Sequence, residues 1–134
     1  IPEEGEYEPN IKDAKPVISP DKLKFGAEKL YKVTNIVDEN TLELDTGLKV
    51  RFFGVNIKRD ELSRLLAYLN EYVKGKQIFL EFDQYSRPES EIVPAYVFLK
   101  NRIFINKELV RQGLANVQIG NFKYKSTFIK VVGD

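Results

Sequence analysis

The sequence contains no cysteine, histidine, methionine or tryptophan among its 134 residues. Without cysteine and histidine it can form no disulfide, use no thiol or imidazole in catalysis, and build no conventional zinc, haem or iron–sulfur site. The groups that remain for chemistry are carboxylates, amines, guanidinium groups, phenols and hydroxyls. The metal that such groups favour is a hard cation such as Ca²⁺ or Mg²⁺. Any catalysis by this chain would therefore depend on carboxylate and metal chemistry.

The sequence also lacks a long apolar run. No stretch approaches the roughly 18 consecutive apolar residues of a membrane-spanning helix, so we expect no membrane span. Because a translated chain starts with methionine and this one starts with Ile1, we expect a processed or shortened N-terminus. Apolar residues make up 43% and charged residues 31% of the sequence, a composition typical of a globular domain.

Neither sign of charge dominates the whole chain, whose formal net charge is +1. The distribution is uneven, because residues 1–22 carry six acidic residues and only three lysines. The same segment contains four of the six prolines. This composition predicts an extended, acidic, proline-rich leader over residues 1–22. Residues 23–134, with 18 basic and 14 acidic residues, are predicted to form a single domain. Its weak positive charge permits contact with nucleic acid without requiring it.

Short segments of alternating apolar and polar residues, separated by turn-forming residues, predict β-strands. Asp38-Glu39-Asn40 and Asp45-Thr46-Gly47 favour tight turns between neighbouring strands. A further turn at Lys100-Asn101 predicts a short return strand. The predicted strands cover residues 29–38, 41–44, 48–55, 77–83, 95–99 and 102–105.

Helical periodicity appears in the middle of the chain. An apolar stripe predicts a helix of about four turns, formed by Leu62, Leu65, Leu66, Leu69 and Val73. Gly75 is predicted to end this helix.

Two shorter helices are expected nearer the C-terminus. Asn106 is predicted to cap the first, which ends at Gly113, and the second spans about residues 124–131. Three strands, a helix and two further strands predict a mainly β fold with α-helices. The expected architecture is a five-stranded OB-type Greek-key barrel, with the helix of about four turns after strand 3 and short C-terminal helices.

Several segments resemble the staphylococcal nuclease-like (thermonuclease) domains. The strongest likeness is the stretch INKELVRQGLA at residues 105–115, which resembles the conserved late helix of that family. IVDENTLEL at residues 36–44 resembles its first hairpin, and VRFFGVN at residues 50–56 resembles its third strand and the start of its active-site loop. Residues 81–83 and 95–97 add weaker similarity in the same order. The resemblance covers roughly residues 29–117 and implies the OB-type fold of that family.

Active members of the family cleave nucleic-acid phosphodiesters with Ca²⁺, so the resemblance implies where such a site would lie. The two aspartates that bind the metal correspond to Asn40 and Asn56, and the carbonyl ligand corresponds to Ile57. Asparagine keeps an oxygen ligand but removes a negative charge at each position, which weakens Ca²⁺ binding. The resemblance therefore implies a site without its metal, and we expect no metal or other cofactor.

The remaining catalytic positions also depart from the family pattern. The glutamate that assists the attacking water corresponds to Arg59, and the proline before it corresponds to Lys58. Of the two arginines that bind the phosphoryl group, Arg51 is retained and the other falls near Ile92. Loss of a general base typically costs about 10²–10⁴ in rate. The resemblance thus implies a catalytically inactive member of the family.

Other carboxylates near these positions leave a second interpretation open. Asp38, Glu39, Asp60 and Glu61 lie within a few residues of the altered positions, and a small shift in alignment would bring carboxylates back to the site. We favour the alternative, in which Asp38 stabilises a turn and the acids at 60 and 61 begin the helix, where the helix dipole favours them.

The leading functional hypothesis is a binding module for an anionic guest, with single-stranded nucleic acid as the first candidate. Arg51, Lys58 and Arg59 would form the phosphate-binding site in the former active-site cleft. Exposed aromatic residues would stack on bases if they do not pack in the core, the candidates being Tyr85, Phe122, Tyr124 and Phe128.

Two alternatives stay open. One is a protein-interaction or structural module, with another protein as its partner. The other is a residual Ca²⁺-dependent phosphodiesterase. The resemblance and the non-methionine start favour a secreted or cell-envelope protein.

Overall fold

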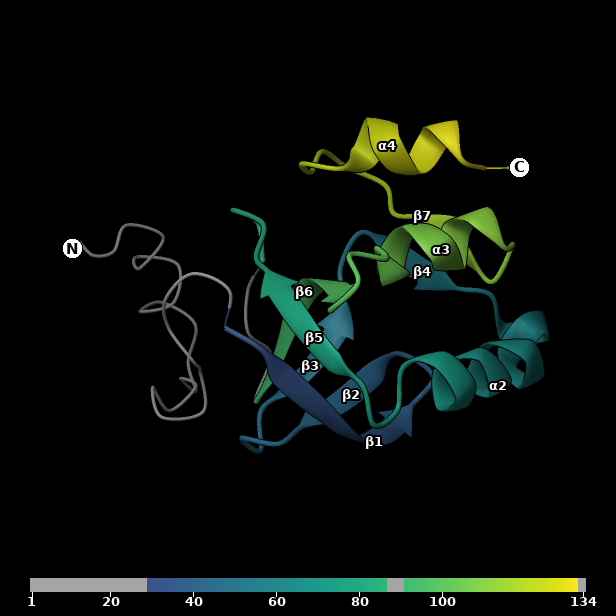
Figure 1. Ribbon diagram of the computed structural model, residues 1–134. Coiled ribbons are helices and arrows are strands. Elements are labelled where there is room, and N and C mark those ends of the chain that lie inside the picture. The colour runs from purple at the N-terminus through teal and green to yellow at the C-terminus, as the bar shows by residue number, and fades with distance from the viewer. Residues whose placement is uncertain (1–28, 87–90, 133–134) are drawn as a thin grey trace.

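Five strands pair in a ring in the computed structural model, which describes residues 29–86 and 91–132 (Figure 1). The order of pairing is β1-β2-β3-β6-β5, and β5 pairs again with β1, which closes the sheet into a barrel. A second, two-stranded sheet consists of β4 and β7. With three α-helices in the described residues, the fold is mixed α and β. The predicted leader, residues 1–22, lies outside the described residues.

The first three strands follow the sequence closely. They are β1 (Tyr31–Asp38), β2 (Thr41–Leu44) and β3 (Lys49–Phe52), each antiparallel to the next. The register between β1 and β2 shifts twice along β1, which explains the irregular apolar pattern of that segment. Gly47, with φ of 87°, makes the turn between β2 and β3.

The third strand is shorter than predicted. Instead of running over residues 48–55, the barrel strand ends at Phe52, and a separate strand, β4 (Val55–Ile57), pairs with β7 (Ala115–Val117). The break falls at Gly54, whose φ of 88° only glycine adopts readily. A Cβ at Gly54 would lie 2.9 Å from ring carbons of both Phe122 and Phe128. The turn and this close approach together redirect the chain from the barrel into the small sheet.

The central helix forms where the apolar stripe predicted it. A short 3₁₀ helix, η2 (Arg59–Glu61), leads directly into α2 (Leu62–Tyr72), an 11-residue helix of about three turns. Leu65 and Leu69 are buried. Gly75 follows the helix with φ of 80°. The helix is about one turn shorter than predicted, and the 3₁₀ segment precedes the predicted range.

The second half of the barrel consists of β5 (Gln77–Glu81) and β6 (Ile92–Leu99). β6 begins three residues earlier than predicted, and it pairs in parallel with β3 and antiparallel with β5. The predicted return strand over residues 102–105 is wrong. Only an isolated bridge joins Phe98 to Phe104, because the chain enters a helix at Ile105.

The two C-terminal helices are α3 (Ile105–Arg111) and α4 (Lys125–Lys130). Gly113 follows α3 with φ of 76°, as the sequence predicted. Helix α4 contacts both α3 and β7, and these three elements lie together at one end of the molecule (Figure 1).

Asn106 does not cap α3. The N-cap position is Phe104, and Asn106 lies within the helix with its side chain fully buried. Its amide oxygen accepts a hydrogen bond from the Val97 N–H (2.8 Å), and its amide nitrogen donates to the carbonyls of Phe53 (2.8 Å) and Ala95 (3.1 Å). The side chain thus joins α3 to two strands of the barrel, a long-range role that a local capping pattern does not reveal.

One connected core of buried apolar side chains fills the barrel and the space beneath the helices. At the end covered by α4 this core is aromatic. Tyr96, fully buried, contacts the rings of Phe53, Phe104, Tyr124 and Phe128.

A buried carboxylate, Asp83, holds the loop after β5 against this aromatic cluster. It accepts hydrogen bonds from the Tyr96 hydroxyl (2.5 Å), the Lys123 N–H (2.8 Å) and the Tyr85 N–H (2.9 Å). Burial, followed by the hydrogen bond to Asp83, raises the pKa of Tyr96 far above its usual value. The carboxylate therefore ties the β5 end of the barrel to the segment that leads into α4.

Candidate functional site

Four of the positions identified from the sequence meet in one small pocket of about 230 Å³. This polar pocket is lined by Glu39, Asn40, Asn56, Ile57 and Arg59. The first two residues form the turn between β1 and β2, the next two belong to β4, and Arg59 begins η2. The turn, the small sheet and the 3₁₀ helix therefore build one site from three separate parts of the chain.

Asn40 is held in place on both sides. Its backbone N–H donates to the Asp38 carboxylate (2.8 Å), and its side-chain oxygen accepts from the Phe52 N–H (3.2 Å). The first contact confirms that Asp38 stabilises the turn. The second fixes the Asn40 amide against the end of β3, so its orientation in the pocket is set by the barrel.

Of the residues that the structure describes, two bring charge to the polar pocket, the carboxylate of Glu39 and the guanidinium of Arg59. The other acids considered from the sequence lie elsewhere. Asp60 and Glu61 belong to η2 and do not line the pocket, and Glu61 forms an ion pair with Arg64 (2.7 Å). Within residues 29–86 and 91–132, no group of three or more acidic, histidine or cysteine side chains is placed to hold a metal ion. The pocket offers amide donors and a guanidinium, a set suited to an anion.

Arg51 and Ile92 lie outside the lining of the polar pocket. Arg51 sits on β3 and pairs with Thr41 on one side and Pro94 on the other. Ile92 begins β6, two residues before Pro94, so Arg51 and Ile92 lie on neighbouring strands and on the same face of the sheet. Both are partly exposed.

Lys58 lines a different surface from its neighbour Arg59. It borders a larger groove of about 660 Å³, here called the β7 groove. The groove is lined by Lys58, Val110, Arg111, Gln112, Gly113, Ala115, Asn116, Val117, Ile129 and Val132. The Lys58 N–H donates to the Leu114 carbonyl (3.0 Å), which holds the end of β4 beside β7. The three cations expected in one cleft therefore do not line a single pocket.

Two of the four aromatic residues considered for base stacking are core residues. Phe128 is fully buried and Phe122 is 8% exposed, because both pack against Gly54 and the aromatic cluster. Tyr124 is partly buried, and its hydroxyl donates to Glu81 (2.8 Å). Tyr85 is 51% exposed and is the one of the four whose ring is open enough to stack on a base.

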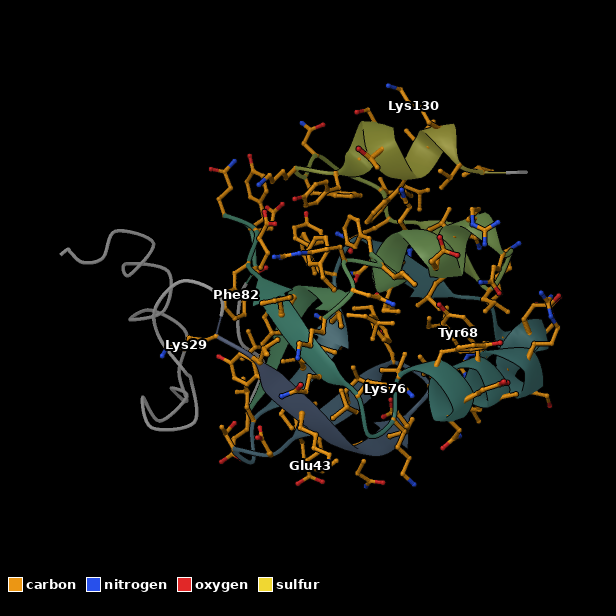
Figure 2. All side chains as sticks on the ribbon, in the orientation of Figure 1. Lys29, Glu43, Tyr68, Lys76, Phe82 and Lys130 are labelled. Atoms are coloured by element: carbon orange, nitrogen blue, oxygen red, sulfur yellow. The ribbon has the colours of Figure 1, made fainter. Side chains whose placement is uncertain are left out.

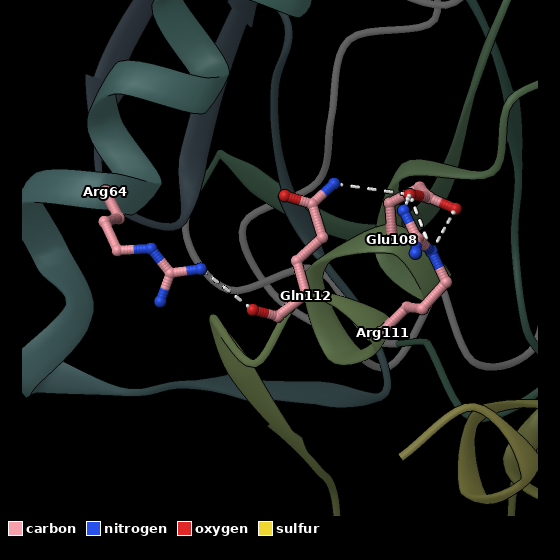
Figure 3. Close-up of polar contacts among 4 residues, drawn as sticks. All are labelled: Arg64, Glu108, Arg111 and Gln112. Atoms are coloured by element: carbon pink, nitrogen blue, oxygen red, sulfur yellow. Dashed lines mark hydrogen bonds and ion pairs between the residues drawn. The ribbon is translucent and has the colours of Figure 1, made fainter. Parts of the chain in front are cut away.

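A polar cluster joins α2 to the end of α3 (Figure 3). Arg64 donates to the backbone carbonyl of Gln112 (3.0 Å), and Arg111 binds the Glu108 carboxylate with its closest contact at 2.6 Å. Hydrogen bonding from Arg111 lowers the pKa of Glu108, against the opposing effect of burial. Tyr68 lies on the side of α2 that faces α3 (Figure 2), and burial raises its pKa to about 12. This cluster is structural, since its charged groups are already paired.

The sequence did not reveal the β7 groove. Its apolar lining comes from α3, β7, α4 and Val132 just after α4, and the packing of these neighbouring elements brings it together. The sequence holds no signal for it, because only the structure shows that Ile129 and Val132 remain exposed beside the groove.

Comparison with known proteins adds no identification: the chain matches no protein-family model and no curated protein. In the described part of the chain, no helix is both long enough and apolar enough to cross a membrane.

Proposed function

We propose that this chain is a catalytically inactive nuclease-like domain that binds single-stranded nucleic acid at the polar pocket. The proposal includes an OB-type Greek-key barrel and membership of the staphylococcal nuclease-like family. A five-stranded ring with a helix between its third and fourth strands in chain order supports the first part. The ordered sequence likeness over residues 29–117 supports the second.

The observation that carries the proposal is the meeting of Asn40, Asn56 and Arg59 in one pocket. The resemblance assigns the two metal-binding aspartates and the catalytic glutamate to these three positions. Asn56 and Arg59 lie at least 16 positions after Asn40, so the fold and not local structure brings them to it. Their meeting at one pocket supports a former active site. Their chemistry has changed from anionic to neutral and cationic.

The residues of the polar pocket do not fit a Ca²⁺ site. Such sites use six to eight oxygen ligands and more than one carboxylate to offset the charge of the ion. Among the described residues Glu39 is the only carboxylate lining the pocket, and the Arg59 guanidinium in the same pocket opposes a cation. Arg59 also cannot act as the base that activates water.

Three of these residues, Asn40, Asn56 and Arg59, suit a phosphate group, and the Glu39 carboxylate opposes it. The guanidinium of Arg59 presents several donors to phosphate oxygens, and the amides of Asn40 and Asn56 add neutral donors. Arg51, on the adjoining strand β3, adds positive charge nearby. A chain of phosphates that passes over this pocket would be bound mainly through its backbone, with little dependence on base sequence.

Fluorescence anisotropy with a labelled oligothymidine tests the proposal. We expect binding that weakens steeply between about 50 mM and 200 mM salt, because counterions are released from the phosphates. Arg59→Ala should weaken binding by about tenfold and lower the salt slope by about one. Lys100→Ala is the matched control, since Lys100 is exposed and lies outside the polar pocket. Equal affinities and slopes for the two variants would contradict the assignment.

A nuclease assay tests the residual-enzyme alternative. Incubation of DNA and RNA with the protein in Ca²⁺ and in chelator should give the same background, and chelator-sensitive cleavage would overturn the proposal. The triple variant Asn40→Asp, Asn56→Asp and Arg59→Glu restores three anionic groups to the pocket. It should bind Ca²⁺ in a calorimetric titration, whereas the unaltered protein should not.

A further inference from the structure

The β7 groove is a second surface with a different chemistry. It lies where the end of α3, the strand β7 and the helix α4 come together, the region at the top right of Figure 1. Its apolar wall includes Val110 and Val117 together with two exposed residues of the C-terminal segment, Ile129 (52% exposed) and Val132 (58% exposed). Apolar side chains that remain exposed around a groove mark a surface that binds another molecule.

Strand β7 has one unpaired edge. The Gln118 N–H bonds to the Gly54 carbonyl and the Lys58 N–H bonds to the Leu114 carbonyl. Along an antiparallel pair of strands, every second residue forms its backbone hydrogen bonds with the neighbouring strand. Since Leu114 and Gln118 are bonded to the β4 side, the N–H and C=O groups of Ala115 and Val117 point away from β4. In the described ranges no hydrogen bond is found for these four groups.

This edge lies along the β7 groove. All three residues of β7 line the groove, whereas the β4 side contributes only Lys58, which follows the strand. Ala115 is 3% exposed, and buried backbone groups without a partner are rare in folded proteins. A ligand that supplies both donors and acceptors at strand spacing would satisfy the edge.

The charge of the groove is positive. Lys58 has no ion pair within the described residues, and no acidic residue lines the groove. The second cation, Arg111, is already bound by Glu108. A single available ammonium beside an apolar wall favours a guest that carries a carboxylate next to apolar side chains.

We propose that the β7 groove binds an extended, acidic peptide segment of a partner protein, which adds a third strand to the β4–β7 sheet along β7. Main-chain hydrogen bonds to Ala115 and Val117 hold the backbone of the peptide. Its alternate apolar side chains pack against Val117, Ile129 and Val132, and one acidic side chain pairs with Lys58. The site is separate from the polar pocket and does not depend on nucleic-acid binding.

A nucleic-acid guest fits this groove poorly. Its lining in the described part of the chain contains no aromatic residue on which bases could stack. The unpaired edge requires alternating donors and acceptors along a strand, which a peptide backbone provides and a phosphate backbone does not.

The probe for the test is the peptide fluorescein-Glu-Val-Glu-Val-Glu-amide, labelled at its N-terminus and titrated with the full chain. We expect saturable binding below about 1 mM. Ile129→Ser should weaken it by at least tenfold, while Ile119→Ser, the matched control outside the groove at 90% exposure, should not. No saturable binding, or equal losses in the two variants, would overturn the proposal. Both side chains are exposed, so neither change should unfold the protein.

Two further measurements separate strand addition from simple apolar docking. A peptide N-methylated at alternate amides should lose binding, and amide exchange at Ala115 and Val117 should slow when the unmodified peptide is bound. Unchanged affinity of the methylated peptide would contradict strand addition.

A charge reversal tests the role of Lys58. Lys58→Glu should abolish binding of the Glu-Val peptide and permit binding of a Lys-Val peptide. If the variant kept the preference of the unaltered protein, the role of Lys58 would be wrong.

The same variants distinguish the two proposed sites. Ile129→Ser should leave oligonucleotide binding unchanged, and Arg59→Ala should leave peptide binding unchanged. If Arg59→Ala weakened peptide binding as much as Ile129→Ser, the peptide would occupy the polar pocket and the assignment to the β7 groove would be wrong.

Discussion

The Asn106 side-chain amide donates a hydrogen bond to the carbonyl of Phe53, 53 residues earlier in the chain, at 2.8 Å. Phe53 is the residue at which the chain leaves the barrel and turns at Gly54 toward β4. Because the same amide accepts a bond from Val97, helix α3 is fixed at once to the end of β3 and to β6. The path of the chain into the candidate site therefore depends on one buried polar side chain.

Replacing Asn106 should destabilise the protein. Asn106→Ala leaves the buried N–H of Val97 without its acceptor and removes the donor to Phe53, so we expect a loss of about 2–4 kcal/mol in the free energy of unfolding. Urea unfolding followed by far-UV circular dichroism measures this loss. Asn121→Ala, at an exposed position, is the control and should change stability by less than about 0.5 kcal/mol. Similar losses in both variants would refute the structural role.

Gly54 should tolerate substitution worse than another glycine with the same backbone conformation. Gly54→Ala combines a positive φ with a Cβ placed 2.9 Å from two aromatic rings, and should cost about 3 kcal/mol. Gly75→Ala has a similar φ of 80° but nothing within 4 Å of its Cβ, and should cost about 1 kcal/mol. Thermal and urea unfolding of the pair measure the difference. Equal costs would mean that Phe122 and Phe128 can move aside.

Asp83 should contribute more to stability than any single one of its hydrogen bonds. Asp83→Asn replaces one carboxylate oxygen, which accepts hydrogen bonds, with an NH₂ group that only donates. The donors that faced this oxygen lose their acceptor, so the free energy of unfolding should fall by about 2–3 kcal/mol. Tyr96→Phe removes only the hydroxyl, and should cost about 1–1.5 kcal/mol. Urea unfolding compares the two variants. A smaller loss for Asp83→Asn than for Tyr96→Phe would show that the bonds to Lys123 and Tyr85 add nothing.

The ion pair of Glu108 and Arg111 should make stability depend on acidic pH. Because Arg111 lowers the pKa of Glu108 in the folded state, the pair stabilises the protein above the unfolded pKa, and the effect is lost as pH falls through the folded value. We expect the difference between the protein and Glu108→Gln to be about 0.5–1 kcal/mol near neutral pH. It should shrink below about pH 4.5. Urea unfolding from about pH 3 to pH 7 measures it, and a difference independent of pH would contradict the assignment.

Much of the barrel could be predicted from local sequence, because its determinants are local. Alternation of apolar and polar residues defined β2 to the residue, and the apolar stripe located α2. Turn chemistry was equally informative, since Asp38 caps the turn beside Asn40 as its side chain predicts. The positions of the candidate site came from the family resemblance and not from these local patterns, and the structure brings Asn40, Asn56 and Arg59 to one pocket.

The errors have a common physical cause in long-range pairing. Residues 48–55 read as one strand, but β4 pairs with β7, about 60 residues later, and the sequence alone gives no sign of that partner. Asn106 has the residue type of a helix cap, yet its amide is satisfied by the barrel. Lys58 and Arg59 are adjacent in sequence, but the change from strand to 3₁₀ helix between them sends each to a different surface.

The register of the small sheet has a practical consequence for any study of the two surfaces. Asn56, which lines the polar pocket, is the direct cross-strand partner of Asn116, which lines the β7 groove. The two surfaces therefore border the same two-stranded ribbon, the polar pocket along β4 and the β7 groove along β7. A substitution at either asparagine would perturb both readouts together, whereas Arg59 and Ile129 stand outside the ladder. Those two residues are the positions from which each surface can be probed alone.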